Sequence, residues 1–135
     1  MPQQVLLPDH NLTEIDQLIE SSRKILDLEE DWDGEDASPI AESTWQRAVG
    51  FLRRNASILW TKYSLRIENP SIVPVPDGSI DLHWKLAGRE LLINIPATQD
   101  KWASYYGDNT QGGNIVKGTL RAESANHWLF VWLTE

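Results

Sequence analysis

The segment SIDLHWKL, residues 79–86, shows the most regular pattern in this chain of 135 residues. Apolar and polar side chains alternate along it, and the apolar set is Ile80, Leu82, Trp84 and Leu86. Successive side chains of a strand point to opposite faces, so the alternation predicts an antiparallel strand with one buried and one polar face. The polar set is Asp81, His83 and Lys85.

Turn signals on both sides of this segment extend it into a meander. Pro76-Asp77-Gly78 precedes it and Ala87-Gly88-Arg89 follows it, and both are typical turn sequences. Residues 72–75 predict a short strand, which Pro74 places at a sheet edge or a bulge. Residues 91–95, 101–106 and 115–120 predict three further strands, with a polar, glycine-rich loop at 108–114.

Two amphipathic helices are expected before the sheet. Residues 1–10 look like an irregular lead-in, and Asn11 with Glu14 forms a capping box for a helix that ends near Leu28. Ser38-Pro39 then predicts the start of a second helix over residues 39–60, because serine caps free amides and proline suits the first helical position.

The C-terminal segment fits two structures. Apolar residues between 125 and 133 lie on one helical face, but residues 127–133 also fit a continuous buried strand. A short helix after Ser124 is the favoured interpretation. The sequence therefore predicts a single α+β domain over residues 1–135. Its helical part, 11–60, packs on an antiparallel meander of four to five strands within the mainly β part, 64–135.

Composition narrows the chemistry and the cellular setting. The absence of cysteine excludes disulfides, thiolate metal sites and a cysteine nucleophile. Neither a signal peptide nor an apolar run of about 20 residues is recognisable, so we expect a cytoplasmic protein without a membrane partner. The net charge is -8, and residues 1–42 hold 12 acidic and two basic side chains. This acidity argues against nonspecific nucleic-acid binding and permits a basic protein partner.

Residues 29–36, the acidic run, hold six carboxylates around Trp32 and Gly34. One interpretation is structural: Trp32 anchors the loop against the core, Asp33-Gly34 makes a turn, and Glu35 and Asp36 interact with the dipole of the following helix. A second interpretation is an acidic docking surface for a basic partner, formed by Asp31, Trp32, Asp33, Glu35 and Asp36.

A metal site is the third interpretation of the acidic run. Glu29, Asp31 and Asp33 fall at positions one, three and five of a calcium-binding loop. However, Ile40 stands at position twelve, where such a loop needs a bidentate glutamate. We therefore expect no cofactor and keep the metal site as an alternative.

Residues 105–114 are the second candidate for binding. Tyr105, Tyr106, Asp108 and Asn109 combine aromatic surface with flexible polar groups, a composition that suits recognition. A long hairpin connection is the plain alternative. The four tryptophans at 84, 102, 128 and 132 are expected in the core.

Catalytic signals are sparse. His83 is expected to be solvated on the polar face of its strand, since an acid–base role would need a partner and a cleft. No nucleophile motif, HExxH motif or glycine-rich nucleotide motif occurs. Whether the chain is an enzyme stays open, and a non-catalytic role is favoured.

Several of these motifs together resemble a widespread family of small uncharacterised bacterial and phage proteins. The shared pieces are Asp31-Trp32-Asp33-Gly34, Ala37, Pro39, Pro70, Pro74, Pro76-Asp77-Gly78-Ser79 and Trp84. A subset of the family also has Leu91-Leu92-Ile93-Asn94-Ile95, Tyr105-Tyr106-Gly107-Asp108, Lys117-Gly118 and a terminal Trp132-Leu133, so that the resemblance spans roughly residues 28–133. The resemblance implies an α+β domain of unknown activity, brings no catalytic residues, and suggests an accessory role in toxin, antitoxin, immunity or phage-defence systems.

Three hypotheses on function follow. The first is a non-catalytic protein-binding module of antitoxin, immunity or inhibitor type, whose partner docks on the acidic run, on residues 105–114, or on both. The second is a small metal-dependent enzyme or toxin that uses Asp31, Asp33 and Asp36. The third is a structural protein that forms oligomers through an exposed sheet edge.

Overall fold

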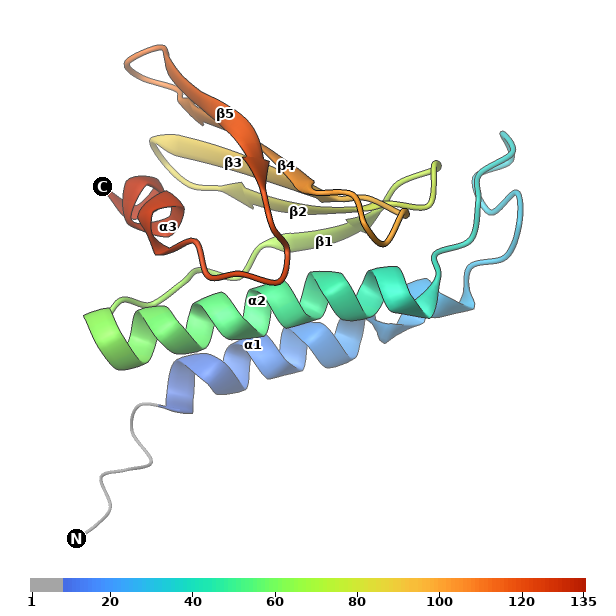
Figure 1. Ribbon diagram of the computed structural model, residues 1–135, viewed down its shortest axis with the longest axis horizontal. Helices are drawn as coiled ribbons and strands as arrows, with labels where there is room; N and C mark the ends of the chain where they lie inside the picture. Colours follow the sequence, from blue (N-terminus) through green and yellow to red (C-terminus); the bar gives the residue numbers. More distant parts are fainter. Residues whose placement is uncertain (1–8) are drawn as a thin grey trace, which may run out of the picture.

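A computed structural model describes residues 9–135 and shows a five-stranded antiparallel sheet with its helices on one side (Figure 1). The elements are α1 (Asp9–Ser22), the 3-10 helix η2 (Arg23–Asp27), α2 (Glu42–Tyr63), β1 (Ser71–Pro74), β2 (Ile80–Lys85), β3 (Arg89–Ile95), β4 (Ala103–Asn109), β5 (Asn114–Leu120) and α3 (His127–Thr134). This architecture confirms the predicted α+β class and its antiparallel meander.

The five strands lie in the sheet in the same order as in the chain. In β2 the predicted alternation is confirmed, because Ile80, Leu82 and Trp84 are buried against the helices. Pro74 ends β1, an edge strand, where its missing N–H does not interrupt the ladder. Gly78 adopts a φ of +91° in the turn between β1 and β2, a conformation that favours glycine.

The core lies between the sheet and α2. This helix packs on β2 and β3, and α1 packs mainly on α2, so α1 forms the outer layer (Figure 1). Phe130 of α3 links the two sides, since its ring lies 5.3 Å from that of Trp84 and 6.0 Å from that of Phe51. All three rings are buried, and aromatic rings bury the largest apolar areas in a core.

The starts of both N-terminal helices differ from prediction. Helix α1 begins at Asp9, so Asn11 lies inside it and is not its cap; residues 1–8 of the expected lead-in lie outside the described residues. Helix α2 begins at Glu42 with Ala41 as its cap, three residues after Pro39. The Ser38 carbonyl, which would accept the first hydrogen bond of a helix capped by Ser38, instead accepts Trp32 Nε1 at 2.7 Å. The Ser38 N–H donates to the carbonyl of Pro76 in the β1–β2 turn, 2.8 Å away.

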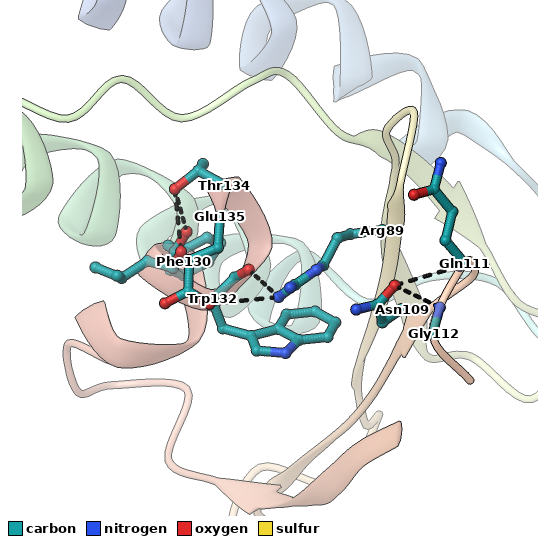
Figure 2. Close-up of polar contacts among 9 residues, drawn as sticks. Arg89, Asn109, Gln111, Gly112, Phe130, Trp132, Thr134 and Glu135 are labelled. Atoms are coloured by element: carbon teal, nitrogen blue, oxygen red, sulfur yellow. Dashed lines mark hydrogen bonds and ion pairs between the residues drawn. The ribbon is translucent and has the colours of Figure 1, made fainter. Parts of the chain in front are cut away.

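The C-terminal segment forms the favoured helix, α3, which Arg89 fastens to the beginning of β3. The Arg89 guanidinium donates to the carbonyl of Trp132 at 2.6 Å and lies 4.7 Å from the centre of its indole ring (Figure 2). Gly107 of β4 makes room for this indole, because a Cβ atom there would come within 2.8 Å of the ring.

Candidate binding surface

The acidic run folds into a loop held by its own carboxylates. Asp33 Oδ1 accepts the N–H groups of Glu35 at 2.8 Å and Ala37 at 3.1 Å. Asp31 Oδ1 accepts the N–H of Asp36 at 2.7 Å. These hydrogen bonds satisfy backbone amides of the loop and fix its conformation. The structural interpretation of Asp33 as a turn-forming residue thus agrees with its contacts.

Trp32 holds this loop by a hydrogen bond, but it is not among the side chains that pack on the hydrophobic core, so the predicted anchor against the core is wrong. Its indole is half-buried, and Nε1 donates to the carbonyl of Ser38 at 2.7 Å. The loop is closed beside it by a backbone hydrogen bond of 2.7 Å from Asp31 to Ala37. The contact expected between Glu35, Asp36 and a helix dipole is wrong, because α2 begins only at Glu42 and the dipole acts over about one turn.

The six carboxylates of the acidic run are exposed, and none forms an ion pair with a described basic side chain. Among the residues that the structure describes, no three histidine or carboxylate side chains gather so that they could hold a metal ion. The geometry therefore offers the metal-dependent alternative no support from Glu29, Asp31, Asp33 or Asp36. It leaves an uncompensated acidic surface beside the β1–β2 turn.

The structure divides the second candidate, residues 105–114, between two faces and a turn. Strand β4 continues to Asn109, so the predicted loop at 108–114 shrinks to residues 110–113. Tyr105 faces the helices and meets Trp128 edge-on at 5.6 Å. Asn109 closes the hairpin, since its Oδ1 accepts the N–H groups of Gln111 at 3.2 Å and Gly112 at 3.0 Å (Figure 2).

Tyr106 and Asp108 alternate with Tyr105 along β4, so they lie on the opposite side of the sheet from the core. No helix of residues 9–135 covers that side (Figure 1). We call this side the open face. Its central row, defined by the strand register, is Ser71, His83, Leu92, Tyr106 and Lys117. Four exposed apolar or aromatic side chains stand on it: Val73, Leu92, Tyr106 and Ile115.

A hollow of about 270 Å³ lies in the open face. We call it the histidine hollow, and its lining residues are His83, Glu90, Leu92, Tyr106 and Asp108. The His83 ring nitrogen Nε2 lies 2.6 Å from Glu90 Oε2. A shallower depression of about 560 Å³ adjoins it and shares Leu92 and Tyr106.

His83 therefore has both a carboxylate partner and a concave surrounding, which differs from the solvated histidine that we expected. The β2–β3 hairpin could have predicted this contact from the sequence. The Leu86 N–H donates to the Arg89 carbonyl, and in the resulting register Lys85 stands opposite Glu90, which makes Glu90 a diagonal neighbour of His83. Within the described chain no serine or threonine hydroxyl is hydrogen-bonded to His83. The arrangement thus lacks the activated nucleophile of a triad.

The four tryptophans expected in the core differ in their burial. Trp84 is buried, as expected, and Trp132 is half-buried beneath Arg89. Trp102 and Trp128 are 50% and 46% exposed, so their assignment to the core is wrong. Trp102 precedes β4 and lies 5.6 Å from the guanidinium of Arg121, a contact that forms at the surface.

The fold and this surface define an α+β protein with one covered and one open sheet face. In the described part of the chain, no helix combines the length and the apolar character that a membrane crossing requires. Comparison with known proteins finds no family model, no curated protein and no solved structure that matches the chain. The resemblance to a bacterial and phage family stays a prediction from the motifs.

Proposed function

We propose that this protein is a non-catalytic protein-binding module of antitoxin, immunity or inhibitor type, and that its partner binds the open face. The observation that carries the proposal is the exposure of Leu92 and Tyr106 beside each other, in register, at the centre of that face. Exposed apolar groups rimmed by polar residues are typical of interaction sites. Tyrosine is among the side chains that contribute most to interfaces.

The partner is proposed to be basic. The exposed carboxylates of the acidic run form no ion pair in the described chain, and the whole chain carries a net charge of -8. Such a surface attracts a positively charged partner and speeds its encounter. The cytoplasmic location and the role in a mobile-element or phage-defence system that the sequence suggests belong to the same proposal.

The acidic run and the β4–β5 turn lie at opposite ends of β2. Ser38, next to the acidic run, binds the β1–β2 turn, whereas Thr110 donates to Gly88 in the β2–β3 turn. The six residues of β2 separate these ends by roughly 20 Å. The open face lies between them, which favours it as the main contact surface.

Capture of a partner from the native host tests this proposal. Tagged wild-type protein is compared with Leu92→Asp on the open face and with Val131→Asp on α3, a control whose native side chain is equally exposed, at 37% against 36%. We expect wild type and Val131→Asp to retain one basic protein that Leu92→Asp loses, with all three melting cooperatively. Equal capture by the three proteins, or no partner for any, would contradict the proposal.

One observation favours oligomer formation as a second candidate. Strand β5 is seven residues long and forms an edge of the described sheet, and open edges can pair with a second copy. Lys117 in the middle of the strand opposes such pairing, since charged residues protect natural edges. Light scattering after size exclusion at rising concentration decides: a constant monomer mass would exclude the second candidate.

A further inference from the structure

We infer that the histidine hollow receives an arginine side chain of the partner protein. This inference rests on the proposed function and names the chemistry of its central contact. It starts from the two carboxylates in the hollow, which come from neighbouring strands: Glu90 from β3 and Asp108 from β4, directly opposite each other in the register.

Both carboxylates keep unused acceptor capacity. Glu90 is half-buried, and its contact with His83 occupies Oε2 and leaves Oε1 without a hydrogen bond in the described chain. Asp108 is also half-buried, and its side chain has no hydrogen bond or ion pair there. Partial burial makes an unpaired carboxylate costly, so a cationic ligand would gain more here than at a fully exposed site.

The remaining walls suit a guanidinium group. Tyr106 contributes an aromatic ring, on whose face a guanidinium can stack, and Leu92 offers apolar surface for the aliphatic part of an arginine. Arginine combines planar stacking with several donors in a fixed fork, whereas lysine carries one compact charge. The volume of about 270 Å³ lies just below the usual range for drug-sized ligands and is large enough to admit a guanidinium group.

Two lysines of the chain stand near the hollow in the strand register. Lys85 stands opposite Glu90, and Lys117 stands opposite Tyr106, but neither forms an ion pair within the described residues. Both are exposed, so water and salt screen their charge. The lining of the hollow contains two carboxylates and no lysine side chain.

Methylguanidinium chloride serves as the probe, added to the ¹⁵N-labelled full chain while amide shifts are followed by NMR. We expect saturable shifts at Glu90, Leu92, Tyr106 and Asp108, beyond those that sodium chloride causes at equal ionic strength. Shifts that do not saturate, or that centre on the acidic run, would overturn the inference. Methylammonium chloride should bind several-fold more weakly, and equal or tighter binding would overturn the assignment to arginine.

Matched variants locate the site. Asp108→Asn should weaken methylguanidinium binding at least about fivefold, a change of roughly 1 kcal/mol. Asp36→Asn removes the same charge from an exposed side chain without a hydrogen bond and should leave binding unchanged. Equal weakening by both variants would mean that only net charge acts. Thermal melts confirm that both variants are folded.

The outcome is distinguishable from failure of the proposed function. If Leu92→Asp abolishes partner capture but methylguanidinium gives no saturable shifts, the open face is an interface and the arginine anchor is wrong. If the partner is still captured by both Leu92→Asp and Asp108→Asn, the open face itself is not the interface and both proposals fall.

Discussion

The side chain of Asp33 accepts two backbone hydrogen bonds within the acidic run, from Glu35 and Ala37. Asp33→Ala should therefore lower the free energy of unfolding by about 1–2 kcal/mol, as loss of a capping carboxylate does. Glu35→Ala removes an exposed carboxylate without such bonds and should change it by less than about 0.5 kcal/mol. Urea unfolding measures both. Equal effects would show that the loop is not held by Asp33.

Glu123 is a carboxylate whose pKa is lowered mainly by one partner, Arg47. The Arg47 side chain donates to it at 2.8 Å and lowers the pKa of the Glu123 carboxyl below its ordinary value. Arg47 is nearly buried and also donates to the carbonyls of Thr98 and Lys101, so this contact ties α2 to the loops before β4 and α3. A substitution at Glu123 therefore reports on how these loops are held.

The pH dependence has a definite sign. Because the pKa of Glu123 is lower in the folded protein, its contribution to stability is present above the ordinary glutamate pKa and is lost as the pH falls through the folded value. The melting temperature should thus decrease as the pH is lowered below about 4.5, and the decrease should be smaller for Glu123→Gln. Asp77, whose pKa the Ser79 hydroxyl lowers, contributes the same sign in both proteins. An unchanged pH profile for the variant would contradict the prediction.

At the scale of elements, α3 depends on the absence of a side chain at Gly107. A Cβ atom there would meet both the Trp132 ring and Val116 at 2.8 Å. Gly107→Ala should therefore destabilise the protein by about 1–3 kcal/mol, the usual cost of overpacking. Gly88→Ala is the control, because nothing lies within 4 Å of its Cβ position. Denaturant unfolding followed by tryptophan fluorescence compares them, and equal stabilities would exclude a tight contact at Gly107.

The helices and strands also show which parts of the fold could be predicted from sequence patterns. The alternation around Leu82 depends only on strand geometry, so the buried face of β2 was predictable. The start of α2 was not, because the Ser38 carbonyl accepts the Trp32 indole, a side-chain contact that the pattern of a helix start does not contain. The pairing of His83 with Glu90 depends on the register of a hairpin, and the exposure of Trp128 depends on how α3 docks. Contacts of this kind appear only after assembly of the fold.

At the scale of the whole molecule, the densest charge and the exposed apolar residues lie on different parts and should act on different steps of binding. The acidic run is highly charged and stands beside the β1–β2 turn, whereas Leu92 and Tyr106 occupy the centre of the open face. Long-range attraction mainly raises association rates, and buried contacts mainly slow dissociation. The molecule would thus attract a basic partner with one surface and hold it with another.

Binding kinetics with the captured partner test this division. Glu29→Gln, Glu30→Gln and Asp36→Asn together remove three charges whose side chains make no hydrogen bond in the described chain. This variant should associate several-fold more slowly at low salt, with little change in dissociation, because steering weakens when charge is lost. Raising the salt should slow wild-type association toward the rate of the variant, since exposed charges are screened. Tyr106→Ala should instead speed dissociation at every salt concentration. If the charge variant changed only dissociation, the acidic run would be part of the contact itself, and the separation of the two surfaces would be wrong.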